Sequence, residues 1–162
     1  MNQRIAPHQE SDLFGLLYGF RFRPGEPGRE IDSSTALECL RAPADPHEFV
    51  WLHLNLAHAG CERWMKTNFE LPDEFLEALH EGSRSTRIEH VDSALLAVVN
   101  DVVFDFNRVS TDIATLWVCV RSNLMISARH QPLRSVDKLR SSVKHGEIFR
   151  SPLELLAHLL RD

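Results

Sequence analysis

Two soft metal ligands, His58 and Cys61, stand three residues apart in the sequence. The apolar spacing over residues 58–69 predicts a helix, on which both side chains would share a face and could help to bind Zn²⁺. A competing interpretation places Cys61 in the core beside Trp64 and Met65, and it fits the apolar stripe better. His58 and Cys61 are therefore the metal candidates, with a core role for Cys61 as the alternative.

Two carboxylates, Asp101 and Asp105, lie in and just after a strongly β-branched segment. Side chains four residues apart in a strand point to the same face, so these carboxylates would form a pair. Paired carboxylates can attract a divalent cation or take part in acid–base chemistry. The alternative is a polar strand end that faces solvent. We take Asp101 and Asp105 as the candidates for attracting cations.

Motifs of the common enzyme classes are missing from the sequence. It contains no G-x-G-x-x-G, no Walker A loop, no H-E-x-x-H and no G-x-S-x-G. Cys119 stands mid-strand beside Trp117, which predicts a buried, unreactive thiol rather than a nucleophile. His53, in a strand pattern, is predicted to be a hydrogen-bonded wall residue rather than a base. We therefore expect that the protein is not an enzyme, has no catalytic residue and requires no cofactor.

Composition bounds the class of protein. The 162 residues suit one domain, over residues 1–162, with a flexible arm at 1–12. The formal net charge of -5 argues against a nucleic-acid partner, which would call for a basic surface. Three widely spaced cysteines make neither a disulfide framework nor a zinc ribbon. No apolar run approaches the roughly twenty residues that a membrane-spanning helix needs.

The hydrophobic periodicity predicts an α/β (α+β) fold, with a mixed, mostly antiparallel sheet and helices on both faces. The strand at 49–56 has bulky side chains on both faces, so it should be covered on both. The other expected elements are strands at 13–22, 94–104, 113–120 and 124–128, an extended stretch at 84–90, and helices at 33–41, 58–69, 71–82, 132–145 and from 151 onward.

The last helix has a strong start signal, a capping box at Ser151-Pro152-Leu153-Glu154. Leu153, Leu156 and Leu160 follow at helical spacing and are expected to pack as one stripe. The helix carries no terminator before Asp162. We expect the native gene to continue beyond it.

The order of the segments resembles the N-terminal domain of the CorA family of divalent-cation transporters, above all its zinc-transporting branch, ZntB. One departure is Ala78, where CorA proteins usually have an aspartate; another is Ser85-Thr86-Arg87 in place of Arg-Pro-Lys. Both departures favour ZntB over a magnesium channel. The resemblance rests on WLHLNL at 51–56, the helix with Trp64, Leu71-Pro72, LEAL at 76–79, RIE at 87–89, the strand at 94–104, NLMISARH at 123–130 and the helix capped by Ser151.

The resemblance implies that this is the cytoplasmic funnel domain of a zinc or other divalent-cation transporter, with a gating or cation-sensing role. It further implies a homopentamer in the inner membrane, with this domain on the cytoplasmic side. A stalk helix and two transmembrane helices, with a Gly-Met-Asn motif, would follow residue 162. Two alternatives are a free-standing metal-sensing or regulatory domain and a small cytosolic hydrolase.

Overall fold

The computed structural model describes residues 14–81, 86–107 and 112–161. Its centre is a seven-stranded mixed sheet in the order β2-β1-β3-β7-β6-β5-β4. β3 and β7 run parallel, and the other ladders between described strands are antiparallel. The strands are β1 (Leu16–Phe22), β2 (Arg29–Ile31), β3 (Phe49–Asn55), β4 (Arg87–Val91), β5 (Ala94–Val102), β6 (Ile113–Arg121) and β7 (Leu124–Arg129).

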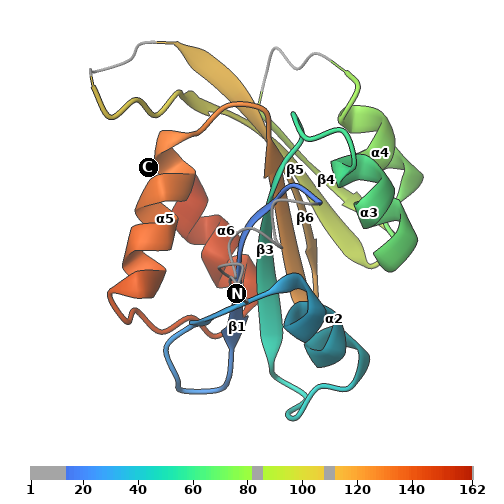
Figure 1. Ribbon diagram of the computed structural model, residues 1–162, viewed down its shortest axis with the longest axis vertical. Helices are drawn as coiled ribbons and strands as arrows, with labels where there is room; N and C mark the ends of the chain where they lie inside the picture. The colour runs from blue at the N-terminus through green and yellow to red at the C-terminus, as the bar shows by residue number, and fades with distance from the viewer. Residues whose placement is uncertain (1–13, 82–85, 108–111, 162) are drawn as a thin grey trace, which may run out of the picture.

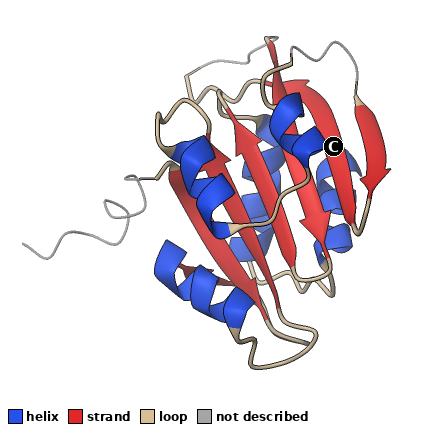
Figure 2. Ribbon diagram, turned by 90° about the vertical axis from the view of Figure 1, so that its right-hand side faces the viewer, coloured by secondary structure: helices blue, strands red, loops and turns tan. Residues whose placement is uncertain are grey.

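Helices cover both faces of the sheet, which makes three layers (Figure 1, Figure 2). α2, α3 and α4 contribute to the core on one face, whereas α5 and α6 pack on the other. The expected fold class is thereby confirmed. The helices are α2 (Ser33–Arg41), α3 (Cys61–Asn68), α4 (Asp73–Ala78), α5 (Arg134–Lys144) and α6 (Pro152–Arg161).

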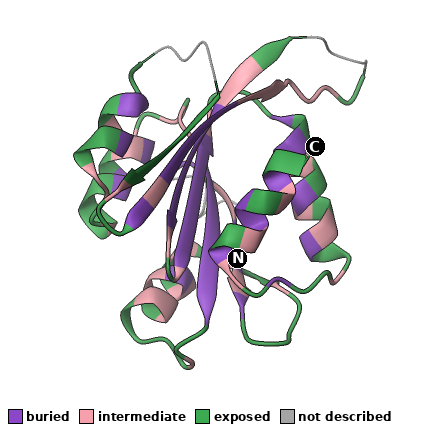
Figure 3. Ribbon diagram, turned by 180° about the vertical axis from the view of Figure 1, so that it is seen from behind, coloured by how far each residue is buried: buried purple, intermediate pink, exposed green. Residues whose placement is uncertain are grey.

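The central strand β3 is buried on both faces, as its sequence predicts (Figure 3). Val50, Leu52 and Leu54 belong to the core under α2, α3 and α4. Phe49 and Trp51 belong to the core under α5 and α6. Because side chains alternate along a strand, the FVWLHLN run supplies large apolar groups to both layers at once.

Two helix starts agree with their sequence signals. The Asp32 carboxylate accepts a hydrogen bond of 2.8 Å from the Thr35 N–H at the start of α2. At α6 the Ser151 hydroxyl accepts one of 3.3 Å from the Glu154 N–H. The Glu154 carboxylate reaches back to the N–H of Arg150, at 2.6 Å, rather than to that of Ser151. The capping box therefore differs from the usual form in one of its two hydrogen bonds, because the Glu154 side chain bonds to the residue before the N-cap.

The apolar stripe predicted for α6 is correct at Leu156 and wrong at Leu153 and Leu160. Its buried face consists of Pro152, Leu155, Leu156 and Leu159. Leu153 is 56% exposed and Leu160 is 39% exposed, and both lie on the outer face. The helix is apolar on two sides, so its leucine spacing alone could not show which side faces the sheet.

Other boundaries differ from the expectation. α3 begins at Cys61 rather than at residue 58, because residues 57–60 form a turn whose N–H groups bond to Asn55 and His58. The short edge strand β2 was not predicted. Residue 82, where the helix expected at 71–82 would end, and the expected arm at 1–12 lie outside the described residues. No helix of the described segments is long and apolar enough to cross a membrane.

Candidate functional site

The metal candidates His58 and Cys61 lie at the start of α3. His58 precedes the helix, and its Nδ1 accepts a hydrogen bond of 3.1 Å from the Gly60 N–H. Cys61 is fully buried, and this burial raises the pKa of its thiol to about 11. Zinc binds the thiolate, so burial opposes metal binding by Cys61. The metal role stays a prediction, while the placement of Cys61 in the core agrees with the alternative interpretation.

The acidic candidates Asp101 and Asp105 do not share a strand face, because β5 ends at Val102. Asp101 Oδ2 accepts a hydrogen bond of 2.7 Å from the backbone N–H of Ser135, in the first turn of α5. Asp105 Oδ1 accepts one of 2.9 Å from the N–H of Asn107. Each carboxylate thus stabilises backbone close to it. Their role in attracting cations stays a prediction.

A metal centre built from several side chains is not visible in the described residues. Across residues 14–81, 86–107 and 112–161, no three His, Cys, Asp or Glu side chains come together as a set of ligands. The position of Ala78 is also structural: it is 5% exposed, and its carbonyl accepts a hydrogen bond of 2.7 Å from Trp117 Nε1. This bond ties α4 to β6.

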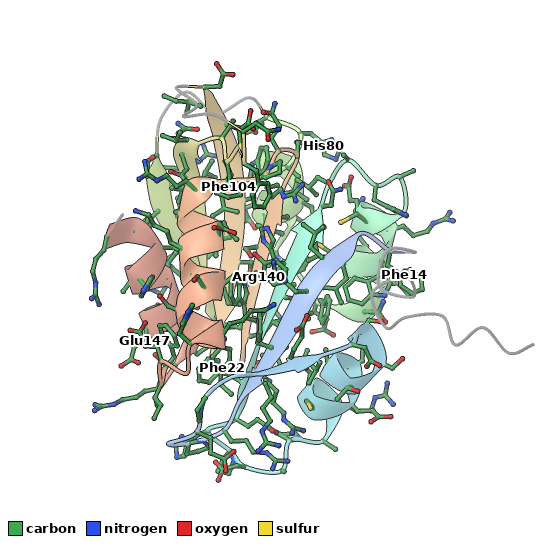
Figure 4. The ribbon with its side chains drawn as sticks, turned by 60° about the vertical axis from the view of Figure 1, so that its left-hand side comes forward. Phe14, Phe22, His80, Phe104, Arg140 and Glu147 are labelled. Carbon is green, nitrogen blue, oxygen red and sulfur yellow. The ribbon has the colours of Figure 1, made fainter. Side chains whose placement is uncertain are left out.

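A cavity of about 250 Å³ lies between α5 and the sheet, at strands β1, β3 and β7. Figure 4 shows Arg140 reaching from α5 towards the strands, with Phe104 above it. The polar lining consists of Tyr18, His53, Arg129, Asp137 and Arg140, and the apolar lining of Leu17, Phe104, Phe106, Pro132, Leu133 and Val136.

A buried hydrogen-bond chain forms one wall of this cavity. The Trp51 indole N–H donates to Ser127 Oγ at 2.8 Å, and Ser127 Oγ lies 2.7 Å from His53 Nδ1. Burial, aided by Arg129, lowers the pKa of His53 to about 3, so its ring is neutral at ordinary pH. Indole can only donate, so Ser127 Oγ is the acceptor in its bond with Trp51. The expectation of a hydrogen-bonded wall residue is confirmed.

Two guanidinium groups and a phenol also line the cavity: Tyr18 and Arg129 come from the sheet, and Arg140 comes from α5. Arg140 Cζ lies 4.6 Å from the centroid of the Tyr18 ring, a cation–π contact. Burial raises the pKa of Tyr18 well above its usual range, and burial lowers that of Arg129. The Nε atoms of Arg129 and Arg140 are buried and, within the described part of the chain, have no hydrogen-bond partner. Sequence reasoning missed this site because its groups come from four separate elements.

The model of the family described as CorA-like Mg²⁺ transporter protein matches residues 46–162, most of the chain. The chain belongs to the CorA family. This agrees with the resemblance carried by the segments from residue 51 onward.

Curated relatives in this family are named as transporters. The chain is 24% identical over 164 residues to the divalent cation transporter CmaX of Pseudomonas aeruginosa, a match that covers 98% of the chain and 48% of CmaX. It is 21% identical over 105 residues to the zinc transport protein ZntB of Yersinia enterocolitica, covering 65% of the chain and 32% of that protein. The chain therefore spans about half the length of CmaX and about a third of the length of ZntB.

Solved structures of the family have the same fold. The full-length CmaX structure superposes with a TM-score of 0.78 at 22% identity, over 90% of the chain and 44% of CmaX. The cytoplasmic domain of ZntB from Vibrio parahaemolyticus gives 0.68 at 14% identity, over 90% of the chain and 56% of that structure. The CorA magnesium transporter of Methanocaldococcus jannaschii gives 0.59 at 14% identity, over 88% of the chain and 43% of that structure.

Proposed function

We propose that this chain is the cytoplasmic funnel domain of a divalent-cation transporter, in which it senses cations or gates the pore. The observation that carries the proposal is the likeness of nine-tenths of the chain to the ZntB cytoplasmic domain. The match of the family model over residues 46–162 supports it. In this role the domain is not an enzyme; it changes conformation or assembly rather than a substrate.

The membrane part of the proposed transporter would follow residue 162. The chain covers about half of CmaX, so a protein of that length would have room for a stalk helix and two transmembrane helices as well. Each span would need about twenty apolar residues. This arrangement would place the domain on the cytoplasmic side of the inner membrane.

Assembly as a homopentamer is part of the same proposal. The outer face of α6 supports it, because Leu153, Ala157 and Leu160 are exposed there at positions i, i+4 and i+7. Such a stripe is the kind of surface that packs against a further helix. A stalk helix or a neighbouring subunit would cover it.

Zinc is our preferred cargo over magnesium. Ala78 cannot ligate a cation and its side chain is buried, so this position offers no carboxylate to a magnesium ion between subunits. The relatives include zinc transport proteins named ZntB. The formal net charge of -5 would help the domain to concentrate divalent cations near the pore.

The test uses the full-length native protein in proteoliposomes that contain a fluorescent zinc or magnesium indicator. We expect zinc uptake that is lost when residues 1–162 are deleted, and a pentamer in detergent by light scattering. A stop codon shortly after residue 162, or a full-length protein that forms a tight dimer, would overturn the assignment. Weak zinc binding by the present chain should disappear in the double variant His58→Ala, Cys61→Ala.

A further inference from the structure

The cavity between α5 and the sheet holds more hydrogen-bond donors than its protein partners use. Two donors that line it, the Nε atoms of Arg129 and Arg140, are buried and have no hydrogen-bond partner within the described segments. The His53 side chain, which is 2% exposed, also lines the cavity. A buried donor without a partner costs stability unless water or a ligand satisfies it.

The charges around the cavity are unbalanced in favour of an anion. Arg129 and Arg140 contribute two positive charges, and Asp137 contributes one negative charge. In the described chain, no ion pair joins either guanidinium to a carboxylate, and each Nε is buried without a partner. A ligand with a single negative charge would leave the site neutral. Guanidinium groups are well suited to carboxylates because their N–H donors match the spacing of the two oxygens.

The size and the apolar lining describe the rest of the ligand. A volume of 250 Å³ equals that of about eight water molecules, so the site suits a small organic molecule. The apolar lining includes Leu17 from β1, Leu133 and Val136 at the start of α5, and Phe104. An inorganic anion would fill only the polar end of this space.

We propose that this cavity binds a small monocarboxylate with an aromatic or branched apolar body. The carboxylate lies between Arg129 and Arg140, whose Nε atoms are the buried donors without a partner in the described chain, and His53 and Tyr18 line the same cavity. The apolar body lies against Leu133 and Val136. This site is separate from the cation chemistry of the proposed transporter, so either proposal can fail without the other.

Benzoate is the probe, and benzamide, which has nearly the same shape without the charge, is its control. We expect benzoate to raise the melting temperature of the chain and benzamide to have at least about tenfold lower affinity, because charge-assisted bonds are about twice as strong as neutral ones. Chloride and inorganic phosphate test for a simple anion site. If benzoate has no effect, or if benzamide or phosphate binds equally well, the proposal is overturned.

Nuclear magnetic resonance locates the site without any mutation. The Trp51 indole N–H is joined to His53 through Ser127, so benzoate should shift its resonance. The Trp117 indole N–H bonds to Ala78 on the opposite face of the sheet and should stay unchanged. Benzoate that shifts Trp117 but leaves Trp51 unchanged would refute the placement.

Variants test the guanidinium groups. Arg140→Gln should weaken benzoate binding at least about tenfold. Arg134→Gln removes the same charge from an exposed position of α5 that does not line the cavity, and should leave affinity within about twofold. Equal losses in both variants would show an effect of net charge only and would overturn the site. If Arg140→Gln fails to fold, the comparison of benzoate with benzamide and the Trp51 resonance decide the matter in the wild-type chain.

Discussion

Acidification should destabilise the chain through His53 well before its native state protonates. The pKa of His53 falls from 6.5 to about 3 on folding, mainly because the ring is buried. Between these two pKa values the unfolded state binds a proton at His53 and the native state does not, so the free energy of unfolding decreases as pH falls below 6.5. Between pH 7.5 and pH 5 this linkage removes about 2 kcal/mol of unfolding free energy, and by pH 3 it would remove about 4 kcal/mol.

The assay is urea denaturation followed by tryptophan fluorescence at pH 7.5 and pH 5. Carboxylates also titrate, so the informative quantity is the difference between the wild type and His53→Gln, which cannot protonate. We expect the wild type to lose about 2 kcal/mol more than the variant over this range. His47→Gln, at an exposed position, controls for the loss of one imidazole. If the wild type and His53→Gln lose the same free energy within about 0.5 kcal/mol, His53 is not a neutral buried ring and the reasoning fails.

Three further predictions concern packing and metal binding. Gly15→Ala should lower the free energy of unfolding by at least about 2 kcal/mol more than Gly25→Ala does. Both glycines have positive φ, but of the two only Gly15 has a backbone oxygen, that of Asn55, 2.8 Å from where a Cβ would lie. Equal losses in urea denaturation would contradict this. Trp117→Phe should lower the melting temperature by about 4–8 °C, because it leaves the buried Ala78 carbonyl without its donor. A decrease of less than about 1 °C in calorimetry would show that this hydrogen bond does not stabilise the fold. Low-millimolar magnesium should leave the melting temperature of this chain within about 1 °C, because the described residues offer no set of three ligands; a rise of several degrees in the same scan would indicate a site.

The sequence predicted a structural feature correctly where one or two neighbouring residues determine it. Asp32 and Ser33 were the two candidates to cap the helix expected at 33–41, and Asp32 caps it; the pattern of β3 predicted that both its faces are covered. The prediction failed where the hydrophobic pattern was too short or was equally apolar on two sides of a helix. β2 has only three residues, two of them exposed, and so shows no pattern. α6 has leucines on both sides, so the face that packs on the sheet depends on the tertiary structure.

The cavity could be predicted only in part, because no local pattern brings its walls together. His53 was expected to be hydrogen-bonded, yet its partner Ser127 lies 74 residues away in sequence. Arg140 reaches Tyr18 only because α5 packs over β1 and β3. Asp101 was expected to attract cations, and the sequence did not show that its carboxylate also accepts a hydrogen bond from the first turn of α5. Each of these contacts depends on which strands are neighbours.

The parallel pairing of β3 with β7 has a consequence for the order of folding events. β2, β1 and β3 lie between residues 16 and 55, and β4 to β7 lie between residues 87 and 129, so each half of the sheet can pair through short connections. The ladder between β3 and β7 alone joins the halves, and it pairs residues such as Val50 and Leu124. Closing so long a loop costs more chain entropy than closing a hairpin. We therefore expect the two half-sheets to form first and their union to limit the folding rate, so residues of this ladder should have high φ-values.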